Sequence, residues 1–144
     1  METDKLSIQR IERIVKLRDM KAKISREERC ASSSPTLTDS SLIDGIYDIF
    51  KSHTTIARSV VMTRKEFIFI VVYLYSPSVL AGGKMGNGLR EKIGDVLGIY
   101  GKSVISDNVS GLMVTYNIYK YFRDDIDAIF PDVMNWLRSV EAIK

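Results

Sequence analysis

The chain has 144 residues, of which 45% are hydrophobic and 27% charged, and its formal net charge is +3. This length suits one domain with a packed core and excludes two large ones. A single cysteine and a single histidine exclude an internal disulfide framework and a zinc cluster built on Cys and His. We therefore expect no metal and no cofactor. The small positive charge is compatible with an anionic partner and does not demand one.

The N-terminus and the apolar segments together indicate a cytoplasmic protein that makes no membrane contact. The first five residues, METDK, carry charges, and the apolar pattern that follows is interrupted, unlike the core of a signal peptide. The longest apolar run, residues 67–75, is much shorter than the roughly 20 residues of a membrane-spanning helix.

Residues 1–30 are predicted to form a basic amphipathic helix. Apolar residues recur at spacings of three or four, and positive charges outnumber negative ones between them. These apolar positions are Ile8, Ile11, Ile14, Leu17, Met20 and Ile24. Such a stripe must be buried, either against the same chain or against another copy, and the second alternative makes this an oligomerisation helix. The spacing holds no clean heptad, which argues against a long coiled coil.

Residues 31–41, "ASSSPTLTDSS", are predicted to be a linker, because small polar residues and a proline dominate them and we expect none to pack in a core. Residues 42–144 then form the main domain. The expected fold is all-α: an N-terminal amphipathic helix, the linker, and a compact helical bundle.

Three segments of the main domain carry local signals. Thr38 or Asp39 is placed to cap a short helix that starts near residue 42. Residues 63–66 form a Thr-x-x-Glu capping box before "FIFIVVYLY", residues 67–75. The β-branched and aromatic content of that run fits a buried strand, whereas the capping box favours a buried helix, and both alternatives remain open. Residues 81–88 contain four glycines and are expected to form a flexible loop.

The C-terminal segment is expected to close the bundle with two helices. Asp124, Asp125 and Asp127 are interpreted as the solvated start of the first, since acidic residues favour a helix N-terminus. Pro131 is expected to end it, and a last helix follows with Trp136 as a core anchor.

The stretch "LGIYGKSVISDN", residues 97–108, has two interpretations. Gly101-Lys102-Ser103 resembles the end of a phosphate-binding loop, which also needs a glycine five residues before Gly101 and a strand leading into it. Position 96 is valine, and residues 88–98 have the periodicity of a helix. The nucleotide-binding interpretation therefore fails.

The alternative is a helix, a tight turn and a second helix. Gly94 lets two helices approach closely, Gly98 can adopt the left-handed conformation that ends a helix, and Ile99 fills the angle between them. Ser103 is expected to cap the second helix. Its inward stripe is predicted to be Ile105, Val109, Leu112, Tyr116 and Tyr119.

Residues 89–112, "LREKIGDVLGIYGKSVISDNVSGL", resemble the helix-turn-helix superfamily of bacterial and phage DNA-binding proteins. The matching positions are Gly94, Gly98, Ile99, Ile105 and Ser106, in a turn one residue longer than the commonest spacing. The resemblance covers 24 residues and implies a DNA-binding tendency, with the second helix entering a groove.

The resulting hypothesis is a small bacterial or phage regulatory or genome-handling factor that binds double-stranded DNA as an oligomer. The expected DNA-binding residues are Arg90, Lys92, Lys102, Ser103, Ser106, Asp107, Asn108 and Ser110. Nothing indicates a catalytic set, so the chain is expected not to be an enzyme. The alternative is a non-catalytic helical interaction or assembly protein of a phage or mobile element.

Overall fold

The computed structural model describes residues 7–32, 35–53 and 59–144, without the side chains of residues 29–32 and of Lys102. Within these ranges every regular element is a helix and no strand occurs, which confirms the all-α class and makes residues 67–75 helical. The chain divides into two compact units, Met1–Ser34 and Pro35–Lys144. The division falls inside the predicted linker, whose residues 33–34 lie outside the described residues.

The first unit contains the helix α1, Ile8–Ser32. Its apolar side chains do not form the single stripe that the spacing predicted. Residues 8, 11, 14, 17 and 20 recur every three positions, and each step falls about 60° short of a full turn at 3.6 residues per turn. The apolar positions therefore wind around the helix, and all of these side chains are exposed.

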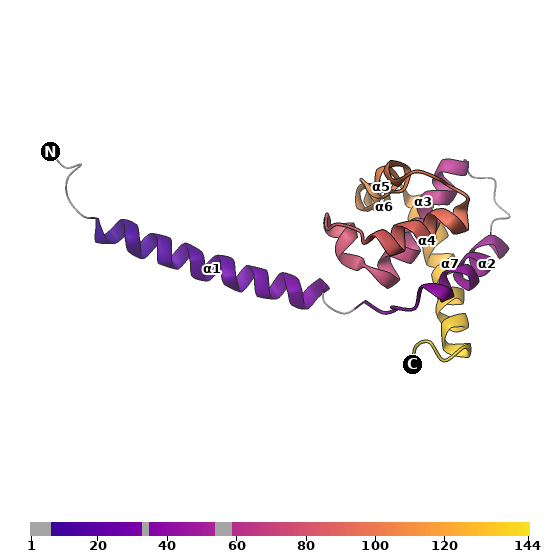
Figure 1. The fold of residues 1–144 in the computed structure, drawn as a ribbon, viewed down its shortest axis with the longest axis horizontal. Helices are drawn as coiled ribbons and strands as arrows, with labels where there is room; N and C mark the ends of the chain where they lie inside the picture. The colour runs from indigo at the N-terminus through magenta and orange to yellow at the C-terminus, as the bar shows by residue number, and fades with distance from the viewer. Residues whose placement is uncertain (1–6, 33–34, 54–58) are drawn as a thin grey trace. The chain divides into compact units, whose positions relative to one another are not determined.

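The second unit is a cluster of helices (Figure 1). Its elements are η2 Ser40–Leu42, α2 Ile43–Ser52, α3 Val60–Tyr75, η3 Pro77–Ala81, α4 Asn87–Leu97, α5 Lys102–Val109, α6 Leu112–Ile118 and α7 Lys120–Ser139. Helix α3 contacts α2, α4, α5 and α7, so it is the central helix on which the others pack.

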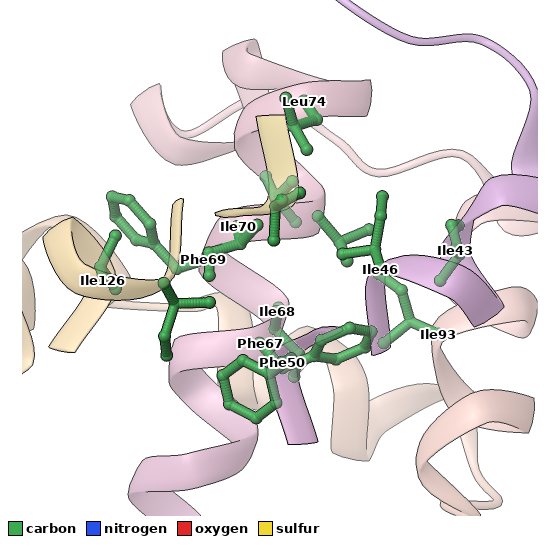
Figure 2. Close-up of a cluster of buried hydrophobic side chains, with 14 of the residues drawn as sticks. Ile43, Ile46, Phe50, Phe67, Ile68, Phe69, Ile70, Leu74, Ile93 and Ile126 are labelled. Carbon is green, nitrogen blue, oxygen red and sulfur yellow. The ribbon is translucent and has the colours of Figure 1, made fainter. Parts of the chain in front are cut away.

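Helix α3 is buried on nearly all sides from Glu66 to Leu74, with Tyr73 as the exposed exception. Figure 2 shows side chains of α2, α3, α4 and α7 meeting in this core. A helix enclosed on all sides needs no polar face, which explains why the sequence of this run lacks helical periodicity.

The predicted capping box does not start α3. Instead the helix begins at Val60, where the Ser59 hydroxyl oxygen accepts a hydrogen bond from the Met62 N–H at 3.2 Å. Thr63 already lies in the helix, and its hydroxyl donates to the Ser59 carbonyl oxygen at 3.1 Å. Because α3 begins three residues before Thr63, this residue cannot act as its cap.

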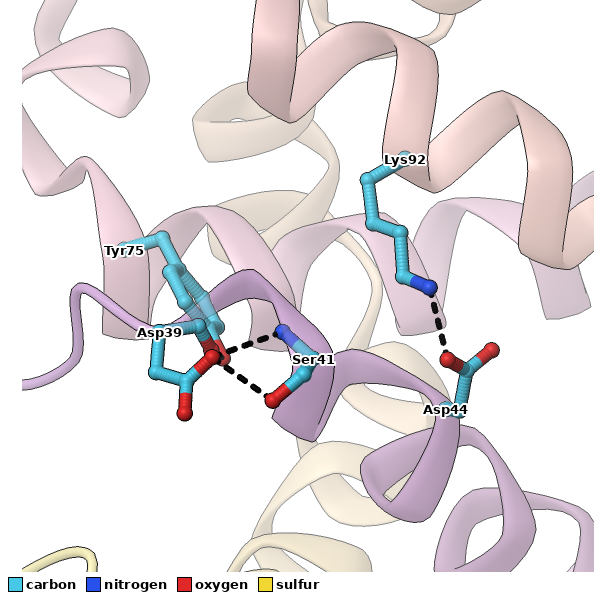
Figure 3. A network of polar contacts seen from close by, with 5 residues as sticks. All are labelled: Asp39, Ser41, Asp44, Tyr75 and Lys92. Carbon is cyan, nitrogen blue, oxygen red and sulfur yellow. Dashed lines mark hydrogen bonds and ion pairs between the residues drawn. The ribbon is translucent and has the colours of Figure 1, made fainter.

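Residues 35–41 belong to the second unit and contribute to its core, contrary to the prediction that residues 31–41 contribute nothing to a core. Leu37 is buried, and its N–H donates to the Leu74 carbonyl oxygen at 3.0 Å. The Tyr75 hydroxyl donates to the Asp39 carbonyl oxygen at 2.5 Å, while the Asp39 carboxylate caps η2 through Ser41 (Figure 3). Burial raises the pKa of Tyr75.

The C-terminal half departs from the predicted helices in two places. Gly111, with φ 78°, separates α5 from α6, so the predicted single stripe is interrupted and Tyr119 at its end is exposed. Helix α7 continues through Pro131, although proline removes one backbone hydrogen bond. Buried Ile129 and Val133 on either side of it pack on the core and hold the helix together. Because α7 begins at Lys120, the acidic residues 124–127 lie beyond its first turn.

Candidate nucleic-acid interface

The turn after α4 is built by two glycines. Gly98 has the left-handed φ of 68° that ends the helix. The Ile99 N–H donates to the Gly94 carbonyl oxygen at 2.8 Å, and the Gly98 N–H donates to the Asp95 carbonyl oxygen at 3.4 Å. This pair of bonds is a Schellman motif. A Cβ on Gly94 would lie 2.8 Å from the Ile99 carbonyl oxygen, so the turn can fold back this closely only over glycine.

Residues 98–101 connect α4 to α5, a length within the three to four residues of helix-turn-helix connections. Gly101 precedes α5 with φ 119°, and no side chain caps the helix. The predicted capping by Ser103 is therefore wrong, because α5 begins at Lys102 after the positive φ of Gly101, and Ser103 already lies in the helix. Ile105 is buried and anchors α5 in the core.

The outer face of α5 is exposed and carries short polar side chains. The exposed members of the predicted set are Ser103, Ser106, Asp107 and Ser110. Val104 is partly exposed beside them, and Tyr100 in the preceding turn is 84% exposed. The structure thus brings four of the eight predicted residues together on one accessible surface, which we call the α5 face.

The two basic residues predicted on α4 are engaged within the chain. Lys92 Nζ lies 2.6 Å from Asp44 Oδ2 on α2 (Figure 3). Arg90 is half-buried, its Nη2 donates to the Met85 carbonyl oxygen at 3.2 Å, and its Nε is buried without a hydrogen bond. Neither side chain can reach a phosphate without giving up these contacts.

The two other predicted residues do not add to the α5 face. The Asn108 side chain is half-buried, and its Nδ2 donates to the Val104 carbonyl oxygen of the same helix at 2.8 Å. That bond occupies an amide hydrogen that adenine recognition would use. The backbone of Lys102 opens α5, and its side chain lies outside the described residues.

A cavity of about 430 Å³ adjoins the α5 face. Lys84 and Gly83 of the glycine-containing loop line it together with Arg90 and Ser106. Lys84 is exposed, so this loop supplies a cation beside a helix whose own outer face carries Asp107. Lys84 was not among the predicted DNA-binding residues, because loop residues have no periodicity that fixes their position, although a lysine among glycines was a visible signal.

Tyr100 is the second residue of this surface that sequence reasoning missed. An aromatic side chain in a turn of two glycines cannot be placed by helical periodicity. Its exposure next to the α5 face makes it available to stack on a base or to pack against a sugar.

A histidine and a carboxylate meet at the C-terminal end of α2. His53 Nε2 lies 2.6 Å from Asp132 Oδ2. No group of three His, Cys, Asp or Glu side chains in the described ranges is close enough to hold a metal ion. None of the described helices combines the length and the apolar composition needed to cross a bilayer. No family model, curated protein or solved structure matches this chain.

Proposed function

We propose that the chain is a helix-turn-helix protein that binds double-stranded DNA, with α5 as the helix that enters the major groove. One observation carries the proposal: α5 is anchored inward by Ile105 while its outer face stays accessible, and the described polar residues of that face have short side chains. Short side chains allow a helix backbone to approach base edges and phosphates closely. A small bacterial or phage regulatory or genome-handling factor is the class of protein that fits this surface.

The charges around the α5 face predict weak binding by a single copy. No described side chain on α5 is an arginine, the residue that most often reads guanine, and Asp107 repels phosphate. Lys84 provides positive charge from the neighbouring loop. Each phosphate neutralised adds to the salt dependence, so binding should fall steeply as salt rises.

A gel-shift series with random duplex DNA at several salt concentrations tests the proposal. Introducing negative charge on the α5 face, with Ser103→Glu and Ser106→Glu together, should abolish the shift. The matched control is Ser40→Glu, an exposed serine in η2. Asp107→Lys should instead strengthen binding. It should also steepen the slope of log affinity against log salt concentration by about 1, because one more counterion is released. A shift unchanged by all of these variants would remove α5 as the DNA-binding helix.

A protein-binding role is the second candidate, and a separate observation favours it. The outer side of α6 exposes Val114 and Ile118, two apolar side chains one helical turn apart. Contiguous exposed apolar surface marks protein–protein interaction sites. A folded sample that shifts no DNA at low salt would favour an interaction or assembly protein.

A further inference from the structure

We infer that a groove beside α6 and α7 binds the α1 helix of a second copy of this chain. The groove, here called the α6–α7 groove, has a volume of about 640 Å³. Most of its lining is aromatic or aliphatic, with contributions from Phe69, Tyr73, Met113, Tyr116, Phe130 and Pro131. This volume lies within the range of about 300–1,000 Å³ that holds a drug-sized ligand, so it can receive several side chains.

Exposed apolar side chains lie at the groove and elsewhere on α6. Val114 is 58% exposed and Ile118 is 65% exposed, while Met113 and Tyr73 at the groove itself are also exposed. At about 100° per residue, Val114 and Ile118 lie on the opposite side of α6 from the groove residues Met113 and Tyr116, so they do not extend the groove. An apolar groove accommodates an amphipathic helix, which inserts side chains spaced at i, i+3 and i+7.

The lining of the groove carries a single charge, which is negative. Asp127 is the one charged residue among those lining it, and it is exposed. Asp124 is also exposed and lies one turn earlier on α7. The groove therefore favours a helix whose apolar stripe is bordered by lysine or arginine.

Helix α1 carries such a stripe. The winding of its apolar residues produces two short stripes on opposite sides of the helix, each with i, i+3, i+7 spacing. One is Ile8, Ile11 and Val15, and the other is Leu17, Met20 and Ile24. At about 100° per residue the two lie about 180° apart. All six side chains are exposed.

Charge distinguishes the two stripes. Glu12 and Asp19 border the stripe of Ile8, Ile11 and Val15. Lysines border the stripe of Leu17, Met20 and Ile24 on both sides. Lys21 lies on one side of it, and Lys16 and Lys23 lie on the other side. Asp19 points away from that second stripe, and the next acidic residues follow after Ile24. The lysine-bordered stripe is therefore the one that complements a groove bordered by Asp127.

Pairing with a second copy of the chain would cover both the α1 stripe and the α6–α7 groove. In the single chain the α1 stripe is exposed, and so are Tyr73 and Met113 at the groove. If two chains exchange their α1 helices, each groove is filled and each stripe is covered, which gives a closed dimer with two-fold symmetry. This inference does not depend on DNA binding, and it would double the number of α5 faces if DNA binding holds.

Sedimentation velocity of the full chain over a range of concentrations, without DNA, tests the inference. We expect a dimer whose dissociation constant rises at least about tenfold with Met20→Asp, because a buried carboxylate is disfavoured. Ile11→Asp is the matched control, since it makes the same change at a similarly exposed residue on the opposite side of α1 (47% against 52%). It should leave the dimer intact. A sample that is monomeric at every concentration overturns the inference.

A charge exchange tests the groove itself. Asp127→Lys should weaken the dimer, Lys21→Asp should also weaken it, and the double variant should recover affinity. Both positions are exposed, so circular dichroism should report unchanged helix content. If the dimer responds to Met20→Asp but not to Asp127→Lys, α1 pairs elsewhere and the groove assignment is wrong. Gel shifts measured in parallel report separately on the α5 face.

Discussion

The Lys92 ammonium and the Asp44 carboxylate form an ion pair that links α4 to α2, with 2.6 Å between Nζ and Oδ2. The Lys92 side chain is 27% exposed and that of Asp44 62%. Lys92→Met should therefore lower the free energy of unfolding by only about 0.2–1 kcal/mol, the range of exposed ion pairs. Because the lysine faces Asp44, the variant should leave DNA affinity almost unchanged.

Lys84→Met is the matched comparison for Lys92→Met, since both remove one positive charge. Lys84 is exposed beside the α5 face, so its loss should weaken DNA binding uniformly across sequences and reduce the salt slope by about 1. Fluorescence anisotropy with labelled duplex DNA measures both variants. Equal losses of affinity would mean that Lys92 leaves Asp44 to contact phosphate.

The close turn after α4 gives a prediction about stability. Gly94→Ala would place a Cβ 2.8 Å from the Ile99 carbonyl oxygen, and a backbone atom cannot move aside without distorting the turn. We expect a loss of about 1–3 kcal/mol in urea unfolding, as for other overpacked sites. Gly88→Ala in the same helix is the control, because nothing lies within 4 Å of its Cβ position. Alanine there should stabilise the chain by roughly 0.5–1 kcal/mol.

Comparing Gly94→Ala with Gly88→Ala also separates the cost of crowding the turn from the general effect of alanine on the stability of a helix. If Gly94→Ala were as stable as Gly88→Ala, the contact between α4 and the turn would not be as close as the hydrogen bond between Ile99 and Gly94 indicates.

The fold was predictable from sequence where the signals are local. Gly98 marks the end of α4 because few other residues adopt its positive φ at low cost. The helical state of residues 67–75 was favoured by polar residues before the run, although the cap proved to be Ser59 and not Thr63. Several serines and threonines precede α3, and only the three-dimensional course of the chain decides which of them stands at the first turn.

The candidate site was predictable in part for the same reason. The spacing of Ile105 and Val109 fixed the inward side of α5, so Ser103, Ser106 and Asp107 followed as outward residues. The partner of Lys92 is 48 residues away in sequence, and no local pattern reports such a contact. The same limit applies to Leu37, whose burial depends on the position of α3.

Gly45 gives a second prediction about packing, because the indole ring of Trp136 lies where its Cβ would be. Gly45→Ala should push the ring away and separate α2 from α7, with a cost of about 1–3 kcal/mol in unfolding free energy. Trp136 is the single tryptophan of the chain, so its fluorescence reports directly on this contact. We expect a red-shifted emission in the folded state, whereas Gly88→Ala should leave the spectrum unchanged.

Asp39 gives a prediction about pH. The Ser41 hydroxyl and then the Ser41 backbone N–H donate to its carboxylate, and they lower its pKa from the ordinary value of 3.8. A lowered pKa in the folded state means that the charged carboxylate stabilises the fold. This stabilisation is complete above the ordinary pKa and is lost as the pH falls through the folded-state pKa.

Asp39→Asn tests this because asparagine can still accept a hydrogen bond from the Ser41 N–H but carries no charge. The variant should be less stable than the natural chain at about pH 6, and the difference should shrink toward about pH 2 as the aspartate becomes protonated. Thermal unfolding followed by circular dichroism at both pH values measures the difference. In a Ser41→Ala background, which lacks the stronger donor, the same substitution should have a smaller effect at the higher pH. A difference that persists unchanged at the lower pH would show that the introduced amide disturbs the cap sterically and that charge is not the cause.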